Sequence, residues 1–173
     1  GTTWTAENCR YPVRKTQENG DDRTKPANII ITCTDNTRSR LELWRFLKKY
    51  RETSVNNERA VYYWMDFGNA QTTGQVFIGT VRNKIRQPAS EEFMPVPGMN
   101  VITEEVNYST IEEKDSEPSC SLAEALERQD LYINSILAQV GCDILWRMFK
   151  EGRTLYRGAY INLDTLRVNP IPV

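Results

Sequence analysis

Three apolar runs in the first half of the chain predict strands of a sheet. Residues 28–33 are rich in isoleucine and show no alternation, which is typical of a strand buried on both faces of a parallel sheet. Residues 60–67 form a second buried-strand candidate, and residues 75–81, with many β-branched and aromatic side chains, form a third. Residues 68–74 are short and polar, so we expect the second and third strands to pair as an antiparallel hairpin.

A helical period follows the first strand almost at once. Residues 41–50 place apolar side chains at the spacing of a helix with one buried face. Asp35, Asn36 or Thr37 can cap this helix, because each side chain can accept a hydrogen bond from a free backbone N–H.

The longest helical pattern lies in the second half of the chain. Residues 121–152 keep the period throughout, and Ser121 stands three residues before Glu124, the spacing of a capping box. Because an average helix is much shorter, we expect a break near Asp130, with the helix ending at Gly152.

The remaining pattern is weaker. Residues 2–13 suit an edge strand, although Pro12 weakens this interpretation. Residues 101–106 suit a short strand, and residues 154–173 suit either two final strands or one strand and a tail. Together these patterns predict one α/β domain over residues 1–173, with a mixed sheet and a long C-terminal helix. A chain of 173 residues is long enough for one domain with a hydrophobic core.

Composition and net charge indicate which kinds of segment and partner are not expected for this chain. Hydrophobic residues make up 39% and charged residues 26%, and no apolar run approaches the roughly 18 residues of a membrane-spanning helix. The first residues lack the pattern of a signal peptide, so we expect a cytoplasmic protein with no membrane partner. The net charge of -1 provides no basic field for nucleic acid.

The cysteines and the absence of histidine narrow the chemistry. Cys9, Cys33, Cys120 and Cys142 form no C-x-x-C pair, so no zinc site is expected. Without histidine, Ser-His-Asp and Cys-His constellations are excluded. Cys33 in an apolar strand and Cys142 on the long helix suit buried structural thiols. Trp44, Trp64 and Trp146 suit core positions.

The polar residues after the first strand are the main chemical candidates. In open α/β sheets, ligands bind at the carboxyl ends of the strands, which is where Asp35 and Asn36 fall. The residues alone leave two readings open for Asp35, a metal-facing carboxylate or a plain helix cap.

One family resemblance bears on that choice. Thr34-Asp35-Asn36 followed by Arg40 resembles the Thr-Asp-Asn…Arg motif of the ThiF/MoeB/HesA group, the bacterial relatives of ubiquitin-activating enzymes. Residues 129–135 and 145–152 are more closely similar to the ThiF-family proteins of PRTRC gene systems.

The resemblance implies a Rossmann-like ThiF fold and ATP-dependent adenylation of the C-terminal carboxylate of a small ubiquitin-like or sulfur-carrier protein. It implies that Asp35 holds Mg²⁺ at the ATP triphosphate, with Asn36 and Arg40 also at the nucleotide. Cys120 falls where ThiF-type proteins place a thioester or acyl-disulfide cysteine, although it also suits a chance cysteine in a loop. A homodimer is expected as well. The alternative is a catalytically inactive partner-binding or assembly subunit of a PRTRC-type gene system.

The chain departs from the family in two respects. No G-x-G-x-x-G loop precedes Thr34, so the backbone cradle for phosphate is missing. The chain resembles the C-terminal two-thirds of such a protein, and alone we expect it to bind ATP weakly or not at all. The C-x-x-C zinc pairs of many relatives are also absent.

Overall fold

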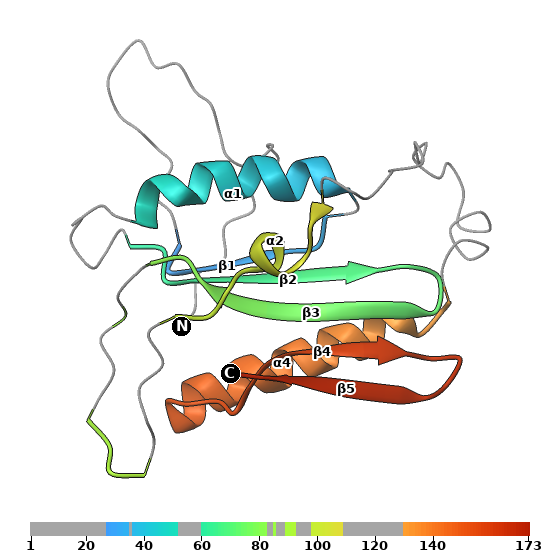
Figure 1. Cartoon of the computed structure of the whole chain (residues 1–173). Coiled ribbons are helices and arrows are strands. Elements are labelled where there is room, and N and C mark those ends of the chain that lie inside the picture. The colour runs from blue at the N-terminus through green and yellow to red at the C-terminus, as the bar shows by residue number, and fades with distance from the viewer. Residues whose placement is uncertain are drawn as a thin grey trace, which may run out of the picture.

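The computed structural model describes residues 27–34, 36–51, 60–82, 85, 89–92, 98–108 and 130–173. These residues form one five-stranded sheet in the order β1-β2-β3-β4-β5, with three helices packed on it (Figure 1). The elements in chain order are β1 (Ile29–Thr32), α1 (Thr37–Arg51), β2 (Tyr63–Asn69), β3 (Thr73–Thr80), α2 (Ile102–Glu105), α4 (Ile133–Glu151), β4 (Tyr156–Asn162) and β5 (Arg167–Pro172).

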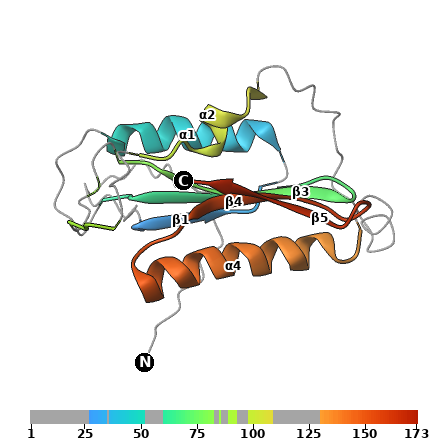
Figure 2. The same ribbon diagram turned by 60° about the horizontal axis from the view of Figure 1, so that its bottom comes forward.

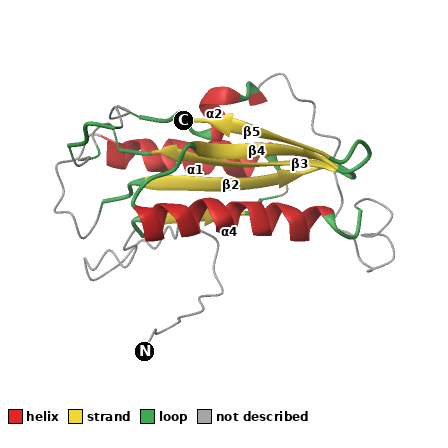
Figure 3. Ribbon diagram, turned by 90° about the horizontal axis from the view of Figure 1, so that it is seen from below, coloured by secondary structure: helices red, strands yellow, loops and turns green. Residues whose placement is uncertain are grey.

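The sheet lies between two helical layers. Helices α1 and α2 cover one face and α4 covers the other, which we call the α1 face and the α4 face (Figure 2). Strand β1 runs parallel to β2, and every later neighbour is antiparallel. Figure 3 shows β2 to β5 side by side, with α4 running along them. The expected α/β class, mixed sheet, β2–β3 hairpin and long C-terminal helix are therefore confirmed.

A side chain caps the start of helix α1. The backbone N–H of Ser39 donates to Asn36 Oδ1 over 2.8 Å, so Asn36 caps the helix by satisfying one of its free N–H groups. Lys48, Lys49 and Arg51 occupy the last turn, where cations are favoured by the helix dipole.

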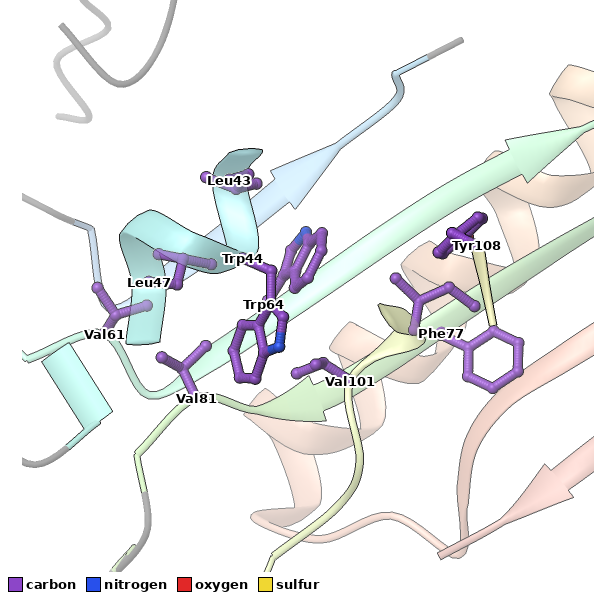
Figure 4. Close-up of a cluster of buried hydrophobic side chains, with 10 residues drawn as sticks. Leu43, Trp44, Leu47, Val61, Trp64, Phe77, Val81, Val101 and Tyr108 are labelled. Carbon is purple, nitrogen blue, oxygen red and sulfur yellow. The ribbon is translucent and has the colours of Figure 1, made fainter. Parts of the chain in front are cut away.

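A pair of tryptophans anchors the core of the α1 face. Trp44 of α1 and Trp64 of β2 stack with ring centroids 6.1 Å apart, and both are buried (Figure 4). Each aromatic ring of this size buries on the order of 150–250 Å². The prediction that both tryptophans are core residues is confirmed. Their buried neighbours are Leu43, Leu47, Val61, Phe77, Val81, Val101, Ile102 and Tyr108.

The core of the α4 face forms along the buried side of α4. Met65, Val76, Ile78 and Ile144 make one cluster, and Ile133, Leu137 and Ile161 make a second. The helix ends at Gly152, which adopts the left-handed conformation that favours glycine (φ 66°), as the pattern predicted. Trp146 is 61% exposed, so the prediction that it belongs to the core is wrong.

The strand predicted over residues 101–106 is also wrong, because the structure has the short helix α2 there. Glu104 explains the difference locally: its carboxylate accepts a hydrogen bond from the backbone N–H of Val101 over 3.3 Å. Arg157 of β4 fixes α2 on the sheet through Glu105 (2.7 Å) and the carbonyl of Asn100 (3.1 Å).

The end of the chain forms two antiparallel strands rather than a strand and a tail. Strand β5 tolerates Pro170 and Pro172 because it is the edge of the sheet, where a missing backbone N–H need not cost a ladder bond. Residues 2–13 and 121–129 lie outside the described part of the chain.

Gly79 provides a test of how α2 is seated. A Cβ at this position would lie 2.5 Å from Val101 Cα and 2.6 Å from the carbonyl oxygen of Asn100. Both are backbone atoms, so Gly79→Ala is expected to lower the free energy of unfolding by about 3 kcal/mol, the upper end for overpacking. The matched change Gly152→Ala meets no atom within 4 Å and only the left-handed φ, so it should cost about 1 kcal/mol. Urea denaturation measures both, and an equal loss would contradict the packing explanation.

Candidate functional site

Strand β1 ends beside the middle of its parallel neighbour β2. Thr32, the last residue of β1, is in register with Asp66, and β2 continues to Asn69. The polar residues that follow β1 therefore emerge next to those of β2, at the N-terminus of α1. This is the strand edge where the sequence predicted the ligand site.

Arg40 of α1 joins these two strands. Its side chain is buried, and its Nε donates to Asp66 Oδ2 over 2.8 Å. Its Nη2 donates to the backbone carbonyls of Thr34 at 2.5 Å and Phe67 at 2.9 Å. One guanidinium thus connects α1, the chain that follows β1 and the middle of β2.

Asp66 is the acidic partner of that network. Its Oδ1 accepts a 2.5 Å hydrogen bond from Thr32 Oγ1, which in turn accepts one from Trp64 Nε1 over 2.8 Å. Burial raises the pKa of the Asp66 carboxyl, while the positive charge of Arg40 and the hydrogen bonds from Thr32 and Arg40 oppose that shift. Both carboxylate oxygens are therefore occupied by partners within the protein.

Two hydroxyl groups near this network have no such partner. Tyr108 is only 8% exposed, and neither its hydroxyl nor Thr34 Oγ1 has a hydrogen-bond partner among the described residues. The Tyr108 ring lies 6.0 Å from the Arg40 guanidinium carbon. Burial raises the pKa of Tyr108, which keeps its hydroxyl protonated and able to donate. Buried hydroxyls without partners are uncommon, and both can bond to a ligand oxygen.

The first turn of α1 is unusual in its charge. It contains no acidic residue, although acids are the residues that a helix N-terminus favours. It contains Arg38 instead, whose side chain is 82% exposed and pairs with Glu42 one turn later at 3.1 Å. A helix N-terminus beside a cation suits an anion such as a phosphate.

The structure describes two of the site residues predicted from the sequence, Asn36 and Arg40, but not Asp35 or Cys120. Asn36 caps α1 and Arg40 lies in the buried network, so the structure brings these two to the strand ends. Asp35 stands between the described residues Thr34 and Asn36 but is itself outside the described part of the chain, as is Cys120.

Both cysteine predictions that the structure tests are wrong. Cys33 is exposed because β1 is an edge strand and the cysteine directly follows it. Partial desolvation and then the charge of Asp66 raise the pKa of its thiol, which does not favour a reactive thiolate. Cys142 is exposed because it lies on the outer side of α4.

Sequence reasoning missed Asp66 and Tyr108. Asp66 had a usable signal, since it is the one charged residue in the apolar run of residues 60–67 and a buried charge needs a partner. Tyr108 had no signal, because its position depends on how the chain continues after α2.

The described residues contain no cluster of three or more acidic or cysteine side chains able to hold a metal ion. Among the same residues, no helix is both long and apolar enough to cross a membrane. Comparison with protein-family models and with curated proteins gives no match.

The Arg40 network leads to a stability prediction with a matched control. Arg40→Met leaves the Asp66 carboxylate buried without its cation, so the free energy of unfolding should fall by about 3–5 kcal/mol. Arg38→Met, two residues away and exposed, should change stability little. Urea denaturation at neutral pH measures both variants. Equal and small effects would mean that Arg40 does not hold the strand ends together.

The pKa of Asp66 gives a second prediction, on pH. A carboxyl whose pKa is raised by folding stabilises the protein below its unfolded pKa of about 3.9, and this contribution is lost as pH rises through the folded pKa. Relative to Asp66→Asn, the parent protein should therefore lose stability as pH rises from acid toward neutral. Denaturation at a series of pH values measures the difference, with exposed Asp143→Asn as the control that should run parallel to the parent. A difference of opposite sign would contradict the raised pKa.

Proposed function

We propose that this protein adenylates the C-terminal carboxylate of a small ubiquitin-like or sulfur-carrier protein, using ATP and Mg²⁺ at the carboxyl end of β1. The proposal adopts the Rossmann-like ThiF fold that the sequence resembles, with a homodimer as the working assembly. The observation that carries it is the position of the Thr34-Asp35-Asn36…Arg40 motif, where a parallel strand ends and α1 begins.

Three features of the described residues support a nucleotide at this edge. The first turn of α1 carries no acid and an exposed arginine, which suits phosphate. The hydroxyls of Thr34 and Tyr108 lack partners and can donate to ligand oxygens. The strand ends themselves are braced by Arg40, so a ligand would meet a rigid edge.

The metal ion is assigned to Asp35 by resemblance, and the donor chemistry fits. Mg²⁺ is commonly bound by one or two carboxylates together with substrate phosphates, so a cage of protein ligands is not required. Asp66 cannot serve as the second ligand while Arg40 and Thr32 occupy its oxygens. Bound there, the ion would offset charge on the phosphate oxygens.

Arg40 enters this proposal as a positioning residue. Its guanidinium holds the carbonyl of Thr34, the residue directly before Asp35. By tying that carbonyl to Asp66 and Phe67, it fixes the direction in which the chain leaves β1. Arg40 would thus act on the nucleotide through the backbone.

A second function rests on the same contacts. Because the guanidinium of Arg40 is committed to partners inside the protein, the motif can serve structure alone. The chain would then be a catalytically inactive ThiF-fold subunit that binds partners in a PRTRC-type gene system.

ATP–pyrophosphate exchange separates these functions. It is measured on the product of the whole gene, mixed with small ubiquitin-like or sulfur-carrier proteins. Adenylation predicts exchange that depends on the carrier and falls at least about a hundredfold in Asp35→Ala, since a lost metal ligand removes charge stabilisation from the transition state. Asp143→Ala, on the exposed side of α4, should exchange normally.

Exchange that survives in Asp35→Ala would exclude the metal role of Asp35. Absence of exchange with every carrier, in a protein that still binds a partner, would favour the inactive subunit.

A further inference from the structure

The outer side of α4 is unusually poor in charge for an exposed helix face. The helix faces the sheet through its buried residues, Ile133, Leu137, Gly141 and Ile144, and no described element lies beyond its outer side (Figure 2). We define the α4 outer stripe as five exposed residues on that side, Ser135, Ala138, Cys142, Trp146 and Phe149. At 3.6 residues per turn they fall within an arc of about 80°. The solvent side of a surface helix normally carries charged residues, and this stripe carries none.

The charges of α4 are confined to its second half. Residues 133–142 contain no charged side chain, and the first charged residue of the helix is Asp143. Asp143 and Arg147 pair with each other over 2.8 Å and flank the stripe. The aromatic part of the stripe lies in the same half, where Trp146 and Phe149 are 61% and 70% exposed. The stripe is therefore small and uncharged at its start, and large and flanked by charge at its end.

The side-chain sizes are arranged symmetrically about Cys142. Ala138 and Trp146 stand four residues before and after it. Ser135 and Phe149 stand seven residues before and after it. Each of these pairs consists of a small side chain and a large aromatic one. A second copy of the helix, running antiparallel about a two-fold axis at Cys142, would place every aromatic ring on a small side chain of its partner. Parallel pairing would oppose ring to ring and leave the small residues apart.

We propose that the α4 outer stripe binds the same stripe of a second copy of this chain, antiparallel about Cys142. The charges agree with this arrangement. The charged half of each helix lies over the uncharged half of the other, and Asp143, the charge nearest the axis, is already paired with Arg147. From Ser135 to Phe149 the helix rises about 21 Å, so the interface belongs to the small class that suits a weak dimer.

This dimer supplies a surface for the homodimer of the proposed function, and it forms without nucleotide. Tests without nucleotide therefore separate it from adenylation, since a failure here leaves the exchange reaction untouched.

Cys142 itself provides a probe of the axis. With the other cysteines replaced (Cys9→Ser, Cys33→Ser and Cys120→Ser), a short bismaleimide should link two chains through Cys142, because both thiols face the axis. Adding Cys142→Ser and Ser135→Cys moves the single thiol along the stripe. The two copies of position 135 would then lie about 21 Å apart, so the linked fraction should fall at least about tenfold. Equal linking at both positions would overturn the proposal, because it indicates parallel pairing or random collision.

Sedimentation velocity of the parent chain, up to millimolar concentration, measures the dimer directly. Ala138→Glu would place a carboxylate against the Trp146 ring of the second copy, so the dissociation constant should rise at least about tenfold. Asn169→Glu adds the same charge at an exposed position on β5 and should leave that constant unchanged. A chain that stays monomeric throughout, or a dimer that Ala138→Glu does not weaken, would contradict the pairing. If Ala138→Glu fails to fold, Trp146→Ser, which removes an exposed ring, is read in the same way.

Discussion

The buried ion pair between Arg40 and Asp66 is the contact on which the strand-end edge depends. It joins a residue of α1 to a residue 26 positions later on β2. Arg40 also binds the carbonyls of Thr34 and Phe67, so it holds the chain that follows β1 against the middle of β2. A buried charge without its partner is strongly destabilising, so neither residue can be replaced alone at small cost. The cap at Asn36 and the stacked tryptophans then hold α1 over the sheet.

This pair also limits what chemistry the edge can perform. Arg40 and Asp66 satisfy each other, so neither is available as a ligand for a metal ion or phosphate while the pair is intact. Among the described residues, the groups that remain for a ligand at this edge are the hydroxyls of Thr34 and Tyr108 and the start of α1. A nucleotide function would therefore depend on these groups and on Asp35, the residue that the family resemblance assigns to Mg²⁺.

Much of the fold could be predicted from local pattern. The first three strands are apolar runs, α1 and α4 carry a helical period, and Gly152 ends α4 by its own conformation. What failed depended on contacts distant in sequence. Whether Cys33 and Trp146 are buried depends on what covers the outer side of β1 and α4, and Arg157 of β4 holds α2 in place of the predicted strand. The Arg40–Asp66 pair could not be predicted from local pattern either, because the two residues lie 26 positions apart in the sequence.

The proposed function requires a nucleotide to bind at the carboxyl end of β1. A two-dimensional NMR titration of the chain with Mg-ATP can test this, because it detects weak binding residue by residue. If Mg-ATP binds at this edge, saturable millimolar shifts should be confined to the amides around Thr34, Asn36 and Ser39 and to Tyr108, with α4 and β5 unchanged. Saturable shifts confined to other parts of the chain would mean that the nucleotide binds somewhere else.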